Sequence, residues 1–341
     1  MMMHHFCKIQ LFCFLAALFM SCGKVADAQT LLKQKSISRM GIPPGNYSGI
    51  TRINDTLYAV VNDKELTEGF HLFSIEMNRK NGKIRNVSDT MISSPHPVPT
   101  GLDMEGVCYR KSSNTLFISD EADQRIREFS LDGNPTGLEL RVPALFSTEH
   151  IVSNRGFEAL TYNHQTGKFW TANESALKSD TANYPLRVYL QCFGDDLQPD
   201  GQFIYHLDAP CKVQGPRTKF YAHGLPALIA MDNGDLIIME RELYSPRRIL
   251  GSRIEVKLYR VTREALEAAG NNDDRPVDKK LIIRFYTHIR IGQINYANYE
   301  GMCLGPTLND GRQTIILIND SQNRSGNRLF RLKDYLKVII L

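Results

Sequence analysis

Two stretches of the sequence repeat the same pair of glutamates at the same spacing. Glu105, in the unit Asp-Met-Glu-Gly, precedes an apolar run that ends at Glu121, and Glu158 precedes a similar run that ends at Glu174. In both stretches the first glutamate precedes the second by 16 positions. Weaker copies of the unit begin at residues 48, 223 and 300. Carboxylates that recur at equivalent places of a repeat are candidates for one shared site.

The chemistry of such a site follows from its charge. In an antiparallel hairpin the first residue of one strand lies beside the last residue of the next, so each glutamate pair should share a sheet edge. Repetition round a closed ring would gather an acidic ring: Asp63, Glu105, Asp120 or Glu121, Glu158, Glu174, Glu240 or Glu242, Glu300 and Asp320. Crowded carboxylates require raised pKa values or a bound cation, and oxygen ligands suit Ca²⁺.

We therefore expect Ca²⁺ as a cofactor. The predicted ligands are Glu105, Glu158, Glu174, Glu240, Glu300 and Asp320. In the alternative interpretation each acid accepts hydrogen bonds from the backbone of a neighbouring loop, and the ring never converges.

Basic residues follow the fourth copy of the unit. They are Arg241, Arg247, Arg248 and Arg253. Arginine binds phosphate oxygens through two parallel hydrogen bonds, so Arg241 is a candidate for orienting a phosphate. His223 opens the same copy and is a candidate acid or base. The alternatives are a solvated loop with Arg241 paired to a glutamate, and a structural histidine.

The elements that must position these residues are short strands. Runs of β-branched and aromatic residues occur at 57–61, 116–119, 169–172, 236–239 and 314–318. The turn pairs Asn81-Gly82, Asp132-Gly133, Asp200-Gly201, Asn233-Gly234 and Asp310-Gly311 lie near them and favour positive φ. One short helix is predicted near 262–269, with Thr262 as its N-cap and Gly270 closing it. The sequence therefore predicts an all-β fold.

The repeat length identifies the architecture. Strand-rich units that recur every 50 to 75 residues or so are typical of a β-propeller. We expect about six blades, with five to seven compatible with the repeats, in one domain spanning residues 29–341. The stretch 30–40 is predicted to close the ring against the C-terminal blade.

Composition excludes several classes of function. The 41 Lys and Arg against 37 Asp and Glu give a net charge of +4, which is too little for binding nucleic acid by charge. No Gly-x-Ser-x-Gly elbow, His-Glu-x-x-His, Cys-x-x-Cys or phosphate-binding Gly-Lys-Ser/Thr loop occurs. A serine hydrolase, a zinc enzyme and a nucleotide-dependent enzyme therefore lack motif support.

Residues 1–28 have the pattern of a signal peptide. An apolar run of about ten residues, 11–20, is too short for a membrane span. Cleavage before Cys22 would give a lipoprotein with Cys22 lipidated, and cleavage after Ala28 would give an ordinary exported protein. We expect a location in the cell envelope, as a lipid-anchored outer-membrane or periplasmic protein, or alternatively secretion. Cys192 and Cys211, in the mature chain, are candidates for a disulfide.

A family resemblance rests on several of these units. The stretches 103–106, 154–160, 240–241 and 299–301, together with 118–121, resemble the bacterial phytase-like family, also described as having esterase-like activity of phytase. The resemblance covers about residues 47–335 and implies an exported propeller that hydrolyses phosphoesters or esters. The chain departs from the pattern at Ser48 and Pro226, where the other copies carry glutamate, which lowers the number of ligands.

Two hypotheses of function follow. In the first, the protein is a metal-dependent hydrolase in which Glu158 or Glu300 activates water, Arg241 orients the substrate and His223 assists. Its partner would be a small phosphorylated or ester substrate, and the protein would be a monomer that touches a membrane only through Cys22. In the second, the protein is a non-catalytic propeller that binds a protein or a glycan.

Overall fold

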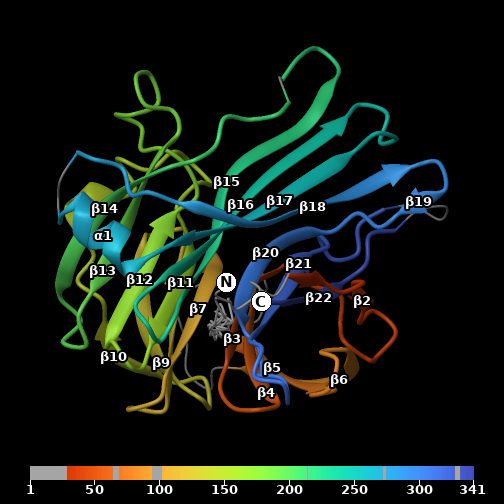
Figure 1. Ribbon diagram of the computed structural model, residues 1–341, viewed down its shortest axis with the longest axis horizontal. Coiled ribbons are helices and arrows are strands. Elements are labelled where there is room, and N and C mark those ends of the chain that lie inside the picture. Colours follow the sequence, from red (N-terminus) through yellow and green to blue (C-terminus); the bar gives the residue numbers. More distant parts are fainter. Residues whose placement is uncertain (1–28, 64–68, 94–101, 213, 272–273, 327–330) are drawn as a thin grey trace, which may run out of the picture.

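Five antiparallel sheets stand round a central axis in the computed structural model (Figure 1). The structure describes residues 29–63, 69–93, 102–212, 214–271, 274–326 and 331–341. The fold is a five-bladed β-propeller, within the predicted range of five to seven blades. Five blades rather than six result because the connection 140–156 and the fourth blade, 218–294, use more residues than the repeat length assumed.

The first three blades consist of consecutive strands, and in each the first strand lies nearest the axis. Blade A contains β3 (Tyr47–Arg52), β4 (Leu57–Asn62), β5 (Gly69–Met77) and β6 (Ile84–Ser93). Blade B contains β7 (Met104–Arg110), β8 (Thr115–Asp120), β9 (Arg125–Ser130) and β10 (Pro135–Glu139). A 3-10 helix, η1 (Ala144–Phe146), leads to blade C, with β11 (Phe157–Asn163), β12 (Lys168–Asn173), β13 (Arg187–Phe193) and β14 (Pro199–His206).

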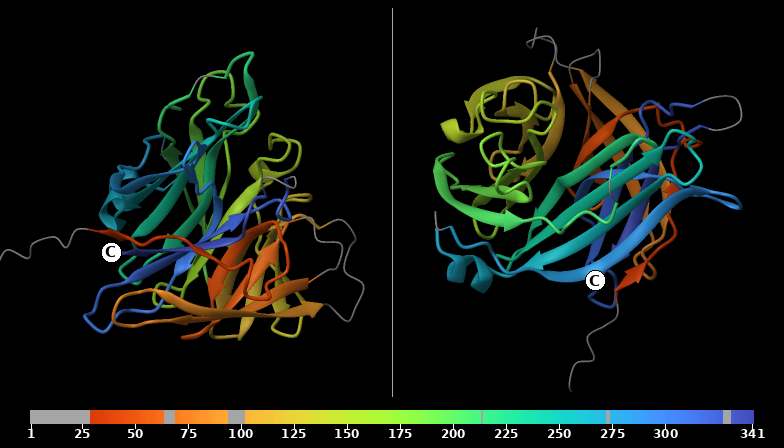
Figure 2. Two further views of the ribbon diagram at one scale, coloured as in Figure 1. Left: turned by 90° about the vertical axis from the view of Figure 1, so that its right-hand side faces the viewer. Right: turned by 90° about the horizontal axis from the view of Figure 1, so that it is seen from above.

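Blade D is longer than the others and projects beyond the ring (Figure 2). Its strands are β15 (Thr218–Ala230), β16 (Leu236–Pro246), β17 (Arg253–Val261), β18 (Lys280–Arg290) and β19 (Gln293–Ile294). Blade E contains β20 (Asn298–Leu304), β21 (Thr314–Asp320) and β22 (Tyr335–Ile340).

The ring is closed by the N-terminal segment, as predicted for residues 30–40. Strands β1 (Thr30–Leu31) and β2 (Lys35–Ser36) both pair antiparallel with β22, with Thr30 opposite Ile340. The two ends of the described chain therefore complete one sheet. A strand added from the far end of the chain protects the edge that β22 would otherwise expose.

The local predictions hold with one correction. Helix α1 (Arg263–Ala269) begins after Thr262, whose side chain accepts a hydrogen bond from Ala265 N (3.1 Å), and ends at Gly270. The glycines of the five predicted turn pairs all have positive φ. Gly201, however, lies inside β14 opposite Cys192, next to a register shift, so Asp200-Gly201 belongs to an irregular strand rather than a turn.

The cysteine and N-terminal predictions have different outcomes. Cys192 is buried and Cys211 is exposed, and both are free thiols, so the disulfide is not formed. Residues 1–28, with the predicted lipidation site Cys22, lie outside the described residues, and export therefore stays a prediction. In the part of the chain that the structure describes, no helix is both long enough and apolar enough to cross a bilayer.

A buried lysine beside the closing strand gives the first testable result. Lys337 in β22 is 7% exposed, its Nζ donates to Leu32 O (3.0 Å), and burial lowers its pKa to about 8. The folded protein therefore releases this proton between about pH 8 and the ordinary lysine pKa, whereas the unfolded chain keeps it. Its contribution to stability should rise with pH over that window.

We expect wild-type stability, measured by urea unfolding at pH 7 and pH 10, to gain up to about 3 kcal/mol relative to Lys337→Met over this interval. Lys33→Met, which alters an exposed lysine of the N-terminal segment that pairs with β22, should follow the wild type. Parallel pH dependences for wild type and Lys337→Met would show that Lys337 keeps an ordinary pKa.

Candidate functional site

Each strand nearest the axis carries a β-bulge near its start. The residues at the register shifts are Ser48 in β3, Glu105-Gly106 in β7, Glu158 in β11, Leu225-Pro226 in β15 and Glu300 in β20. A bulge interrupts the alternation of side chains and re-aims the extra residue. The repeated glutamates thus occupy the bulge in three blades, and Ser48 and Pro226 occupy it in the two blades that depart from the pattern.

The glycine that follows a bulged glutamate is explained by the tight approach of neighbouring blades. A Cβ on Gly106 would lie 2.7 Å from Glu158 O, and one on Gly301 would lie 2.9 Å from Ser48 O. Distances this short leave no room for a side chain, so the Glu-Gly pairs let the innermost strands meet backbone to backbone. The motif therefore serves both the ring and the placement of its carboxylates.

A cavity of about 610 Å³ opens at the centre of the ring on the side of these bulges. Its carboxylate lining is Asp63, Glu105, Glu158, Glu174, Glu300 and Asp320. Its cationic lining is Arg155, Lys219 and Arg241. The acids therefore outnumber the bases two to one, and the predicted convergence of the acidic repeats on one mouth of the channel is present for these six residues.

One arginine is fixed among the acids. Arg241 in β16 donates through Nη2 to Glu174 and through Nη1 to Glu300 and to Asn298 Oδ1 (3.1 Å). The other oxygen of Glu174 accepts from Arg155, and Asn298 Nδ2 donates to Glu300 Oε1 (2.7 Å). Because Glu174 lies in blade C, directly after β12, while Arg241 and Glu300 lie in blades D and E, this network joins three blades.

Two glutamates of the cavity have strongly raised pKa values. Burial, followed by the charge of Glu158, raises the pKa of Glu105 well above its ordinary value. Burial, followed by the charge of Glu174, does the same for Glu158, while the positive charge of Arg241 acts in the opposite direction. Glu158 Oε2 is buried and has no hydrogen-bond partner among the described residues. Glu158 therefore presents an uncommitted carboxyl oxygen in the cavity.

The remaining acids differ in how their charge is balanced. Burial raises the pKa of Glu300, although Arg241 and Asn298 oppose the effect. Burial, with the charge of Glu300 next, raises the pKa of Asp320 well above its ordinary value. Burial alone would lower the pKa of Arg241, but Glu174 and Glu300 raise it above the ordinary range, so the guanidinium stays charged. The cavity can therefore exchange protons or take up a further cation.

The family described as phytase-like, or esterase-like activity of phytase, matches residues 42–322. This match covers all five bulges and most of the chain. The chain belongs to the phytase-like family. The resemblance seen in the sequence units is thereby confirmed. The matched range begins slightly before, and ends before, the range of about 47–335 expected from the sequence.

Several solved structures resemble this chain at low sequence identity. A streptogramin B lyase is 12% identical, with 92% of this chain and 98% of that chain covered and a TM-score of 0.37. The PQQ-bound aldose sugar dehydrogenase of Streptomyces coelicolor is 10% identical, with the same coverage and a TM-score of 0.42. A duf4221 family member from Bacteroides vulgatus is 10% identical, again with 92% and 98% covered and a TM-score of 0.43. No curated protein matches.

Two predicted site residues of this phytase-like protein lie elsewhere. Glu240 accepts from Tyr205 Oη (2.7 Å), from Asp208 N (3.0 Å) and from Lys279, so it fastens the packing of blade C against blade D. His223 lies opposite Glu242 in the register of β15 and β16, and neither His223 nor Glu240 lines the cavity. Adjacent strand residues face opposite sides, so the side of β16 that presents Arg241 cannot also present its neighbour Glu240.

The six predicted cation ligands also do not come together around one point. Among the described residues, one carboxylate group beside the cavity has ligand oxygens within 4.8 Å of one another: Asp63 and Glu105, which line the cavity, and Asp103, which lines a separate pocket. Glu105 is the one member that the prediction contained. Glu174 and Glu300 are engaged by Arg241 instead, because a long arginine from the next blade reaches between them.

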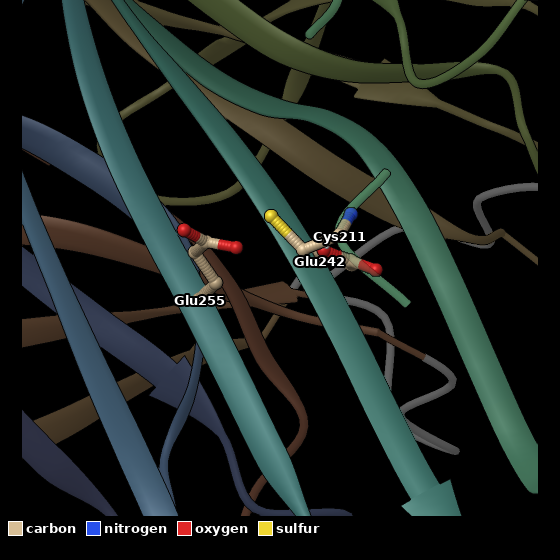
Figure 3. Close-up of side chains that lie close together, drawn as sticks. All are labelled: Cys211, Glu242 and Glu255. Atoms are coloured by element: carbon tan, nitrogen blue, oxygen red, sulfur yellow. The ribbon is translucent and has the colours of Figure 1, made fainter. Parts of the chain in front are cut away.

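A second group with metal-ligand chemistry lies on the outer part of blade D. Figure 3 shows Cys211, Glu242 and Glu255 with the thiol directed toward Glu255. Glu242 accepts from the backbone N of Cys211 (2.9 Å) and Lys212 (2.7 Å), while Arg284 donates to Glu255. These contacts fasten the connection from blade C onto the sheet, so we interpret the group as a loop anchor.

Two residues of the site were missed as functional candidates. Asp103 shares the Asp-x-Glu unit with Glu105, and that spacing of two could have indicated a shared carboxylate pair. Arg155 precedes Glu158 by three residues and lines the cavity while it binds Glu174. The paired glutamates themselves behave as predicted at the sheet edge, since Glu121 N donates to Asp103 O (2.8 Å) and Glu174 N donates to Gly156 O (2.8 Å).

Proposed function

We propose that this protein is a metal-dependent hydrolase of phosphoesters or related esters, with the central cavity as its active site. The observation that carries the proposal is the placement of Glu105 and Glu158 at equivalent bulges, both with raised pKa values, in an open cavity beside a fixed arginine. Membership of the phytase-like family supports the reaction class.

Glu158 is the proposed general base. Its Oε2 is buried without a hydrogen-bond partner among the described residues, so an ionised Glu158 can accept a proton from a water molecule in the cavity. A raised pKa makes this carboxylate a stronger base than an ordinary glutamate, and the charge of Arg241 keeps part of it ionised. Arg241 is therefore a positioning residue that acts through the charge of Glu158.

To bind a phosphate or carboxylate group of the substrate, a basic side chain must have N–H groups that are not already hydrogen-bonded within the protein. Both terminal nitrogens of Arg241 are used by Glu174, Glu300 and Asn298, which argues against its predicted role as the substrate clamp. Arg155 and Lys219 line the same cavity and are more exposed to solvent than Arg241. We assign substrate orientation to Arg155 and Lys219, since arginine and lysine both bind oxyanions.

The donor set fits Ca²⁺ on one side of the cavity. Asp63, Asp103 and Glu105 supply hard oxygen ligands within 4.8 Å of one another, and these three residues would hold the ion. Besides burial, the charges of Glu158 and Asp63 both raise the pKa of Glu105, so a cation bound here would relieve repulsion between carboxylates. Bound Ca²⁺ would supply charge neutralisation and polarise a substrate oxygen.

The decisive experiment assays metal-stripped protein on a panel of phosphoesters and carboxylic esters, with and without added Ca²⁺. We expect turnover that depends on Ca²⁺ for at least one substrate class. A protein that binds a glycan or a protein ligand but hydrolyses nothing on the panel would instead be the non-catalytic propeller.

Ca²⁺ binding itself has a separate readout. Addition of Ca²⁺ at about 100 times its dissociation constant should stabilise the metal-free protein by about 2.7 kcal/mol, visible as a rise in Tm. Asp63→Asn with Glu105→Gln should abolish this rise, and Glu240→Gln should keep it because Glu240 lies outside the cavity. An undiminished response in the double variant would place the ion elsewhere.

A further inference from the structure

Three neighbouring segments form the outer end of blade D, which we call the blade D tip: residues 214–221, 245–253 and 287–296. Hydrogen bonds join them, from Arg247 N to Arg217 O (2.8 Å) and from Gly251 N to Ile289 O (2.7 Å). None of the three segments contains aspartate or glutamate. This is unusual in a chain whose acidic and basic residues nearly balance.

The basic residues of the blade D tip are available to a partner. The exposed ones are Arg217, Lys219, Arg247, Arg248 and Arg290. None of them forms an ion pair with a carboxylate of the described residues. The backbone hydrogen bonds between the three segments hold these charges together at one end of the blade.

Large apolar side chains share the same tip. Phe220, Ile249, Leu250, Ile291 and Ile294 are each more than half exposed, and Ile291 is 90% exposed. They make up five of the nine exposed large hydrophobic residues in the described parts of the chain. Single exposed apolar residues need no explanation, but a group gathered on one projection marks an interaction surface.

The position of the tip relates it to the cavity. The left view of Figure 2 shows the outer end of blade D, in green and teal, projecting above the rest of the ring. Lys219, Phe220 and Ile249 belong both to the tip and to the lining of the cavity. A surface that docks on the tip would therefore lie beside the mouth of the cavity.

We propose that the blade D tip docks on an anionic lipid surface. Its apolar side chains would enter the boundary between headgroups and acyl chains, and its arginines and lysines would meet the lipid phosphates. A soluble polyanion would use the positive charge but leave the exposed isoleucines in water. The proposal is independent of hydrolysis, and it adds a contact to the lipid anchor predicted at Cys22.

The test is flotation of the full chain with vesicles of phosphatidylcholine alone or mixed with phosphatidylglycerol. We expect binding to the mixed vesicles and little to the neutral ones. Arg247→Gln with Arg248→Gln should weaken binding roughly tenfold or more, since each basic residue near an anionic surface contributes about 1 kcal/mol. Ile249→Ser with Ile291→Ser should weaken it comparably by removing the apolar contact.

Matched controls keep the experiment specific. Lys83→Gln with Arg85→Gln removes two exposed charges from blade A, and Leu138→Ser removes an exposed leucine from blade B. Both should bind like the wild type. Because every variant shares the same N-terminal segment, differences between variants report the tip.

A fluorescent variant locates the contact. The chain has a single tryptophan, Trp170, which is buried, so Ile291→Trp adds one exposed reporter at the tip. Its emission should shift to the blue on addition of the mixed vesicles. Equal binding to both kinds of vesicle, unchanged binding of the tip variants, or binding of RNA without binding of vesicles would overturn the proposal.

Discussion

Replacing Glu158 by glutamine will lower turnover of the hydrolysed substrate by about 10²- to 10⁴-fold, the range expected for loss of a general base. The amide keeps the size of the side chain but cannot accept a proton from water. The fold should tolerate the change, because Glu158 Oε2 has no hydrogen-bond partner among the described residues to lose. The rate of product formation in quenched reactions with enzyme in excess over substrate measures the chemical step.

Glu300→Gln is the matched comparison within the same cavity. Glu300 is held by Arg241 and Asn298, so its loss should reduce turnover less than the loss of Glu158 and should show mainly as lower stability. Wild-type turnover should rise with pH through the raised pKa of Glu158, and this rising limb should be missing from the residual activity of Glu158→Gln. Equal activity of Glu158→Gln and wild type would remove Glu158 from the mechanism.

The sequence predicts the fold and the place of the carboxylates because both depend on local patterns. Alternating apolar runs and turn glycines define the strands, and the spacing from Glu105 to Glu121 matches a hairpin whose ends share an edge. The bulges leave a trace as well, since Glu-Gly recurs where two blades meet backbone to backbone. Even the departures at Ser48 and Pro226 fall on bulge residues.

The partners of the carboxylates could not be predicted, because they come from other blades. Arg241 reaches Glu174 and Glu300 over a separation in sequence that no repeat encodes. The prediction for His223 rests on its place at the start of the fourth copy, but the bulge of β15 falls later, at Leu225-Pro226, and His223 does not line the cavity. The sequence could give the blade count only as a range of five to seven, because blade D is longer than its repeat unit suggests.

Arg241→Met will destabilise the protein by about 3–5 kcal/mol at pH 7, the cost expected when one partner of a buried ion pair is removed. Arg241 is 4% exposed and is the cation shared by Glu174 and Glu300, so the variant leaves two carboxylates facing each other in the network that joins blades C, D and E. Methionine fills much of the arginine volume, which limits the contribution of a cavity to the loss.

The pH dependence separates this electrostatic cost from a packing defect. Without Arg241 the pKa values of Glu300 and Glu158 lose the influence that lowers them, so both carboxyls take up protons at higher pH in the folded variant than in the unfolded chain. Stability of Arg241→Met relative to wild type should therefore recover as pH falls toward 5 and be poorest above neutral pH. The rising limb of turnover should also move to higher pH.

Urea unfolding of both proteins between pH 5 and 8 measures the difference, and Arg263→Met serves as the control. Arg263 pairs with Glu267 on the surface of α1, where both side chains are exposed, so its loss should cost less than about 1 kcal/mol at any pH. A penalty for Arg241→Met that stays constant across this range would mean that packing, and not the charge shared between the three blades, sets the role of Arg241. A stability loss that becomes smaller as the pH is lowered would make the same arginine responsible for joining the blades and for keeping Glu158 ionised.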